Sequence, residues 1–161
     1  MSTDTSLMVR SHEENWLPVL ELAIEEVFEI MVGSRVKPAP KGEGTPPGGF
    51  TAMVGIAGGL CGILTISCNK KTACEIAKCM LGPEIADSEE QVSDALGEIC
   101  NMIAGNFKNK LSSADHACML SVPTVIKGEE YSFRSLADGE ELETAMMFGE
   151  SSVTVCLQLH S

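Results

Sequence analysis

The alternation of apolar and polar residues along the chain predicts three helices, of which the first is expected at residues 15–32. In this segment apolar residues recur every three or four positions, as on the buried side of a helix. Asn15 is suited to cap its start, Pro18 is tolerated in a first turn, and Gly33 suits its end. The preceding residues, 1–14, are mostly polar and are expected to form an N-terminal tail.

Two further helices are marked at both ends by capping signals. One is expected at residues 70–81, between a cap at Asn69 and a stop at Gly82-Pro83. The other is the longest, at about residues 89–111, and it opens with the capping box Ser88-Glu-Glu-Gln91. Because both segments carry a start signal, an apolar stripe and an end, we expect helices there.

Short apolar runs bounded by turn residues predict an antiparallel sheet. Residues 50–58 and 60–68 form a predicted hairpin around Gly58-Gly59, after a Pro- and Gly-rich loop at residues 37–49. Further strands are expected at residues 116–126, 130–136, 141–149 and 151–159, with a turn at Glu150-Ser151 between the last two.

With 161 residues the chain has the length of one domain, which we place at residues 15–161. The order of elements indicates an α+β fold, with long helices packed on an antiparallel sheet. The two halves also resemble each other. Laying Gly33 over Gly105 puts Glu26 on Glu98 and Glu29 in the place of Asn101. Helix surfaces look alike, so an internal pseudo-repeat of helix-plus-hairpin units and a chance likeness both stay open.

The charge and the cysteines exclude several classes of protein. The formal net charge is −12, whereas binding to nucleic acid or to an anionic membrane requires a basic surface, so we expect neither partner. No apolar run is long enough to span a bilayer, and no apolar leader opens the sequence. The seven cysteines form no CxxC pair, and with His12, His116 or His160 they show no zinc-type spacing. We expect a cytoplasmic protein with buried cysteines and no metal site.

The longest predicted helix carries a pair of polar residues in an apolar neighbourhood. Glu98 and Asn101 are three residues apart, which places them side by side on a helix surface, and Asp94 extends the acidic edge by one turn. Gly97 and Gly105 lie on the same helix, and each costs about 1 kcal/mol relative to alanine. The pair is therefore either a solvated edge, with glycines that only admit a neighbouring element, or a site that a partner approaches closely.

If the pair is a functional site, its residue types allow only a few kinds of reaction. A carboxamide exchanges no protons at neutral pH, which excludes a pair of glycosidase carboxylates. No Ser, Cys or His completes a nucleophile and base, and Cys100 is expected on another side of the helix. A carboxamide does orient a water molecule, and a carboxylate pairs with a lysine of a partner. Both suit phosphoryl transfer to water, in which positioning supplies most of the rate.

The segment DALGEICNMIAGNFKNKL at residues 94–111 resembles the signature helix of the CheC/CheX/FliY family of chemotaxis phosphatases. The hallmark is Glu-x-x-Asn, here Glu98 and Asn101, followed by a glycine, here Gly105. The flanking blocks GIAGGLCGILTISCNKKTACEIAKCMLG and LSVPTVIKGEEYSF also resemble CheX-type members, so the likeness covers roughly residues 15–159. The resemblance implies a CheC-like fold.

It also implies a function. The substrate of the family is a CheY-like response regulator that carries an aspartyl phosphate. By resemblance, Asn101 orients the attacking water, and Glu98 pairs with a lysine of the regulator. Asp94, Gly105 and Lys108 lie on the same helix and are expected to contact the partner, with Lys110 as a second possible cation. Mg²⁺ belongs to the regulator, so no cofactor or metal of the chain's own is expected, and CheX-type members imply a homodimer.

Glu29 stands where a second site would need its asparagine, so the first helix is expected to be structural, with one site per chain. Two other functions stay open. The domain is either a non-catalytic adaptor that binds a receiver domain or another signalling partner, or a component of a larger assembly such as a flagellar switch.

Overall fold

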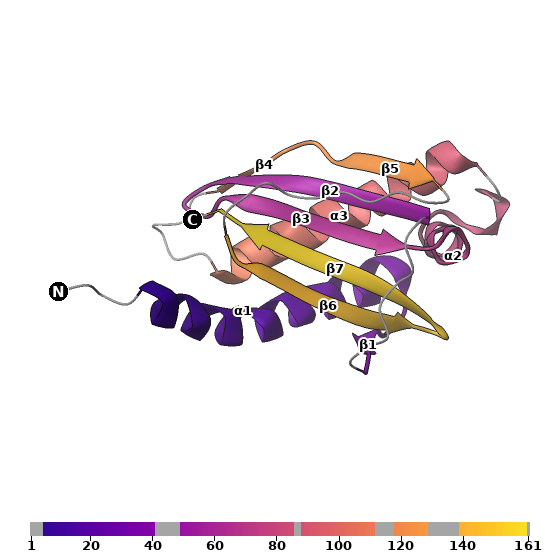
Figure 1. Cartoon of the computed structure of the whole chain (residues 1–161). Helices are drawn as coiled ribbons and strands as arrows, with labels where there is room; N and C mark the ends of the chain where they lie inside the picture. Colours follow the sequence, from indigo (N-terminus) through magenta and orange to yellow (C-terminus); the bar gives the residue numbers. More distant parts are fainter. Residues whose placement is uncertain (1–4, 41–48, 86–87, 112–117, 129–138, 161) are drawn as a thin grey trace.

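The computed structural model describes residues 5–40, 49–85, 88–111, 118–128 and 139–160, with side chains from residue 16 onward in these ranges. The helices lie on one face of an antiparallel sheet, which confirms the predicted α+β fold (Figure 1). Within the same ranges, no helix combines the length and apolar character needed to cross a bilayer.

The second and third helices begin and end where their capping signals place them. α2 covers Lys70–Leu81 and α3 covers Glu89–Leu111. The Asn69 side chain accepts a hydrogen bond from the backbone N–H three residues on at 2.8 Å, and the Ser88 hydroxyl accepts the corresponding bond at 3.4 Å. Gly82 ends α2 with a φ of 101°, a backbone angle that favours glycine.

The first helix is longer than predicted. α1 covers Thr5–Val27 and continues into one π-helical turn, η1, at Phe28–Val32. The expected start at Asn15 is wrong, because Asn15 and Pro18 both lie inside α1. The stretch predicted as a polar tail contains several good helix formers, so its polarity does not prevent a helix. Gly33 ends the helix as predicted, with a φ of 72°. The domain boundary before Asn15 stays a prediction.

The described part of the chain holds seven strands and a short 3-10 turn. The predicted hairpins are confirmed as β2–β3 and β6–β7, although the last turn lies at Gly149-Glu150, one residue earlier than expected. Residues 116–126 are not one strand, because residues 121–123 interrupt the ladder, and the strand predicted at 130–136 lies outside the described residues. The bounds are β1 Lys37–Pro38, β2 Gly49–Gly58, β3 Gly62–Cys68, η2 Pro83–Ile85, β4 Cys118–Leu120, β5 Thr124–Gly128, β6 Glu141–Phe148 and β7 Ser151–Leu159.

The order of strands in the sheet confirms the pseudo-repeat. The sheet runs β1-β6-β7-β3-β2, and β4 and β5 both pair with β2 at the far edge. The first half supplies α1 and β1 to β3, and the second half supplies α3 and β4 to β7. In this comparison β1, β2 and β3 correspond to β5, β6 and β7. Replacing each strand by its counterpart gives the same strand order, read from the opposite edge of the sheet. Each half therefore completes the other, since β1 pairs with β6 and β5 pairs with β2.

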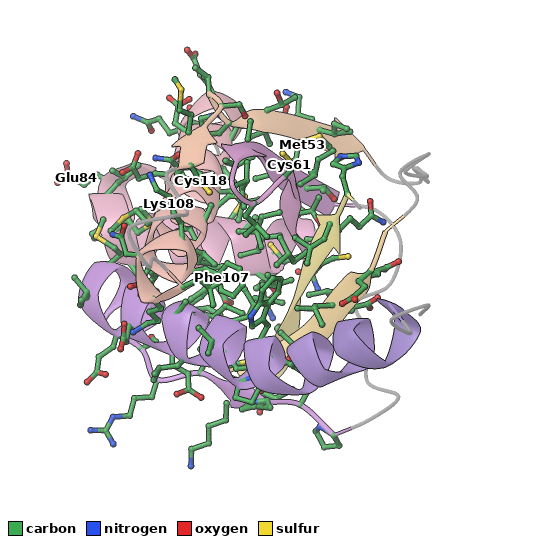
Figure 2. All side chains as sticks on the ribbon, turned by 90° about the vertical axis from the view of Figure 1, so that its left-hand side faces the viewer. Met53, Cys61, Glu84, Phe107, Lys108 and Cys118 are labelled. Atoms are coloured by element: carbon green, nitrogen blue, oxygen red, sulfur yellow. The ribbon has the colours of Figure 1, made fainter. Side chains whose placement is uncertain are left out.

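The core fills the layer between the helices and the sheet. β2 directs Phe50, Ala52, Val54 and Ile56 toward the helices, each at most 3% exposed. Figure 2 shows Phe107 of α3 among the side chains between α1 and the sheet. This packing turns one side of α3 inward along the whole helix.

The cap of α2 supplies the first test. Replacing Asn69 with alanine leaves the Thr72 N–H without its side-chain acceptor, so the free energy of unfolding should fall by about 1 kcal/mol. Asn69→Asp keeps an acceptor at this position and should stay close to wild type. Urea denaturation measures both variants, and equal stability of Asn69→Ala and wild type would contradict the capping role.

Candidate active site

The five residues predicted for the site share one side of α3. Asp94, Glu98, Asn101, Gly105 and Lys108 follow one another at spacings of four and three residues, which places them within an arc of about 80°. Asp94 and Glu98 are exposed, and the other three are half-buried. We call this side the α3 stripe. The opposite side is at most 2% exposed at Val92, Leu96, Ile99, Ile103 and Phe107.

Glu98 and Asn101 are neighbours at the centre of the stripe. Three residues apart on an α-helix, their Cβ atoms are about 5–6 Å from each other. Neither side chain makes a hydrogen bond or ion pair with another described residue. Both groups therefore keep their hydrogen-bonding capacity for water or for a partner.

The two glycines of α3 have different surroundings. A Cβ on buried Gly97 would lie 3.3 Å from Pro123 Cβ and 3.6 Å from Val125 Cγ2, so glycine lets the edge of the sheet approach closely. A Cβ on Gly105 would meet only Leu120 Cδ1, at an ordinary contact distance of 3.8 Å. The purely structural interpretation therefore accounts for Gly97, whereas the packing does not require a glycine at position 105.

Cys100 lies on the buried side of α3, as predicted, and offers no nucleophile to the stripe. Its Sγ lies 3.6 Å from the carbonyl oxygens of Ala52 and Leu64, to which the thiol donates. Burial raises the pKa of the Cys100 thiol to about 12. At neutral pH the group is a protonated thiol inside the core, which is inert as a nucleophile.

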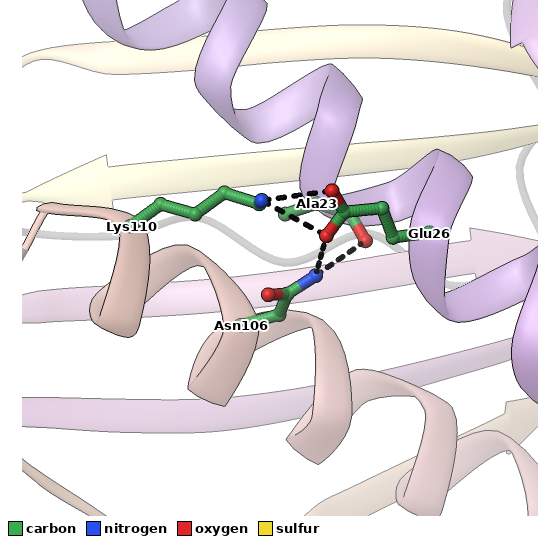
Figure 3. A network of polar contacts seen from close by, with 4 residues as sticks. All are labelled: Ala23, Glu26, Asn106 and Lys110. Atoms are coloured by element: carbon green, nitrogen blue, oxygen red, sulfur yellow. Dashed lines mark hydrogen bonds and ion pairs between the residues drawn. The ribbon is translucent and has the colours of Figure 1, made fainter.

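A polar network joins the end of α3 to α1 (Figure 3). The Glu26 carboxylate lies 2.9 Å from Lys110 Nζ and accepts a hydrogen bond of 2.9 Å from Asn106 Nδ2. The same amide group donates to the Ala23 carbonyl oxygen at 3.3 Å. Lys110 is thus engaged within the fold, whereas Lys108 on the α3 stripe makes no ion pair with a described residue.

The corresponding segment of α1 has a different geometry. Glu26, which aligns with Glu98, is occupied by Asn106 and Lys110, so it has a structural role. Glu29 is exposed on the π-helical turn, and Gly33 ends that turn in a left-handed conformation. Gly105, by contrast, lies within the continuous α-helix of α3. The sequence letters of the two segments align, but their backbones do not present side chains in the same way.

One group of possible metal ligands occurs among the described residues, and the sequence spacing does not indicate it. Glu141 and Glu143 on β6 and Cys156 on β7 have ligand atoms within 4.8 Å of one another. The Cys156 thiol donates to Glu141 Oε1 at 3.3 Å, and burial together with this hydrogen bond raises its pKa. A protonated thiol is a poor metal ligand. The expectation that the chain needs no metal stays a prediction.

Comparison with known proteins identifies the family. Residues 50–147, more than half of the chain and including all of α3, match the family model described as chemotaxis phosphatase CheX. The chain belongs to the CheX family. Glu98 and Asn101 therefore fall within the part that CheX proteins share.

Individual CheX proteins agree with this assignment. The CheY-P phosphatase CheX of Thermotoga maritima is 31% identical over 90 residues, which are 55% of this chain and 58% of that protein. The match thus spans somewhat more than half the length of this curated relative. The crystal structure of a chemotaxis protein CheX from Desulfovibrio desulfuricans superimposes with a TM-score of 0.80 at 26% identity, covering 91% of this chain and 99% of that one.

The fold also matches a CheX that was crystallised with its partner. The CheX chain in a CheX–CheY–BeF3–Mg²⁺ complex from Borrelia burgdorferi has a TM-score of 0.75, with 91% of this chain and 98% of that chain covered. At 22% identity this likeness concerns the fold.

The glycines of α3 supply a matched pair of variants. Gly105→Ala adds a methyl group where there is room, so it should raise the free energy of unfolding by about 1 kcal/mol through helix propensity. Gly97→Ala gains the same propensity but pushes against Pro123, and it should be less stable than Gly105→Ala. Denaturant titration compares them. An equal increase in the free energy of unfolding for both variants would show that Pro123 can move aside at little cost. Packing would then not require a glycine at position 97.

The Glu26 network predicts a pH-dependent contribution to stability. Hydrogen bonds from Asn106 and then Lys110 hold the pKa of Glu26 below its ordinary value of 4.5. A carboxylate with a lowered pKa stabilises the fold above its unfolded pKa, and this contribution is lost as pH falls through the folded pKa. Glu26→Gln should therefore be less stable than wild type at pH 7, with a gap that shrinks below about pH 4.5.

Thermal unfolding between pH 7 and about pH 3 measures this gap. Glu29→Gln is the matched control, because it removes the same charge from an exposed side chain without a described partner. A gap for Glu26→Gln that stays constant across this range would contradict the network's electrostatic role.

Proposed function

We propose that this chain hydrolyses the aspartyl phosphate of a CheY-like response regulator and that the α3 stripe is its active site. The observation that carries the proposal is the pair of exposed Glu98 and half-buried Asn101, which have no partners among the described residues and lie on a helix within the CheX-matched segment. The Thermotoga relative that is named a CheY-P phosphatase supports the choice of substrate.

In this mechanism Asn101 positions the nucleophile. Its carboxamide oxygen accepts a hydrogen bond from a water molecule, and its NH₂ group donates one toward the phosphoryl oxygens. The water then attacks phosphorus in line with the aspartyl oxygen, the acyl-phosphate bond breaks, and inorganic phosphate and the regulator's free carboxylate result. Little covalent chemistry is required of the protein, because orientation and charge complementarity supply most of the rate.

Glu98 has a role in docking rather than in proton transfer. We assign it an ion pair with the lysine of the regulator, which fixes the register in which Asn101 enters the partner's site. Lys108 and Asp94 extend the stripe on either side with charges of opposite sign. Charges on the receiver that complement Lys108 and Asp94 would favour one orientation of the bound receiver, although the chain as a whole carries a net charge of −12.

The chain itself supplies no nucleophile in this proposal. The α3 stripe contains no Ser, Cys or His, and the thiol of Cys100 is buried and protonated at neutral pH. Direct attack by water is therefore the path assigned, with Mg²⁺ held by the regulator. Homodimer formation and a cytoplasmic location are further parts of the proposal.

Substitution of Asn101 tests the catalytic assignment. Wild type should accelerate phosphate release from a phosphorylated receiver, and Asn101→Ala should lose this acceleration by about a hundredfold or more, as when a positioned donor is removed from a transition state. Glu98→Ala should mainly raise the receiver concentration that gives half-maximal rate. Gln91→Ala is the control, because it removes an exposed carboxamide ten residues before Asn101, which is about 15 Å along α3.

Binding has to be measured in parallel, on the same variants. If Asn101→Ala and wild type bind the receiver equally and give the same rate of phosphate loss, the catalytic assignment of Asn101 is wrong. If that rate also equals the rate of the receiver alone, the chain is an adaptor.

A further inference from the structure

Gly105 is a glycine inside α3 that the fold itself does not explain. It lies in a regular α-helical turn, six residues before the helix ends at Leu111, so neither a positive φ nor a helix end requires it. Among the described residues, a Cβ at this position would come within 4 Å only of Leu120 Cδ1, at 3.8 Å. Close packing therefore does not require a glycine either, although a helix interior is less stable with glycine than with alanine.

The helix geometry relates Gly105 directly to Asn101. Residue 105 follows Asn101 by four positions, which is about 6 Å along the helix axis and about 40° around it. Because every Cα–Cβ bond of an α-helix tilts toward the N-terminus, a side chain at position 105 would lean over the turn that carries Asn101. Glycine therefore leaves the C-terminal flank of Asn101 uncovered.

The sheet edge already limits the approach to Asn101 from one side. Leu120 lies next to Gly105 and Pro123 lies next to Gly97, so this edge runs alongside the part of α3 between the two glycines. Asn101 lies in that part and is half-buried. An added side chain at position 105 would narrow the access that remains.

We propose that Gly105 is a positioning residue for the phosphatase reaction. Because it has no side chain, it lets the receiver domain come close enough for Asn101 to reach the phosphorylated aspartate. The inference rests on the proposed function. It assigns the lower stability of a glycine in this helix to activity, since functional sites are often less stable than other sequences would make them. The effect is expected to be large, because a displacement of about 1 Å can reduce a rate by about a hundredfold.

The experiment compares Gly105→Ala and Gly105→Leu with wild type, because alanine and leucine both favour helices but differ in size. Phosphate release is measured against the concentration of phosphorylated receiver, and urea denaturation measures stability. Gly105→Ala should raise the urea midpoint while it lowers kcat/KM by about tenfold, and Gly105→Leu should lower kcat/KM by about a hundredfold. A glycine needed only for folding would instead lose stability and activity together when it is replaced.

Ser93 supplies a matched control on the same helix. It is half-buried like Gly105, and it lies eight residues before Asn101, about 12 Å along the axis and about 80° around it. Ser93→Leu adds a large side chain away from the approach to Asn101, so kcat/KM should stay within about twofold of wild type.

Three results would overturn the inference. They are an unchanged kcat/KM for Gly105→Leu, an equal loss for Ser93→Leu, and a Gly105→Ala variant whose urea midpoint and kcat/KM fall together.

Binding to a beryllofluoride-loaded receiver separates this inference from the proposed function. Gly105→Leu should bind it about tenfold more weakly than wild type, because steric overlap at a close contact costs binding energy. If wild type binds without accelerating hydrolysis, the catalytic proposal fails, and weaker binding by Gly105→Leu still supports a close approach at Gly105. If wild type hydrolyses and Gly105→Leu matches it in rate and binding, only this inference fails. If wild type does not bind, both fail.

Discussion

The structure depends on the requirement that α3 bury one side against the sheet. Leu96, Ile99 and Ile103 are at most 1% exposed and lie under the centre of the helix. Because a helix repeats every 3.6 residues, fixing these side chains inward fixes which residues face outward. Glu98 and Asn101 are thus presented by the same packing that stabilises the fold, and Cys100, hydrogen-bonded to two strands, belongs to the buried side.

The pairing of the two halves explains how a symmetric fold carries an asymmetric site. Each half lends an edge strand to the other, so neither completes its sheet alone. The symmetry ends at the helices. Glu26 of α1 is held by Asn106 and Lys110 of α3, whereas Glu98 of α3 has no such partner among the described residues. The carboxylate that joins the helices in one half corresponds to the one that is offered to solvent in the other.

The sequence predicts those features whose causes are local. Asn69 and Ser88 lie within three residues of the groups that they cap, and the apolar stripe of α3 follows from its own spacing. The start of α1 is missed because a favourable capping residue, Asn15, does not end a helix when the residues before it are also good helix formers.

Features that depend on distant pairing cannot be derived in this way. Glu26 and Lys110 are separated by 84 positions, and nothing in either segment marks the other as its partner. The bulge at residues 121–123 exists because β2 pairs with both β4 and β5 in registers that differ by one residue. The local sequence signal for this interruption of the strand is Pro123, since proline is disfavoured inside a regular β-ladder. The sequence pattern and the family resemblance predict the site residues. The bulge in the sheet edge beside them follows only from the strand registers.

An exposed site of this kind depends on its partner to become a closed one. A water molecule bound to half-buried Asn101 stays in contact with bulk solvent until another surface covers α3, and positioned groups act most strongly where bulk water is excluded. The receiver in the proposed reaction brings the phosphate and Mg²⁺ and also closes the site. The residues around the α3 stripe therefore matter for the reaction without touching the phosphorus.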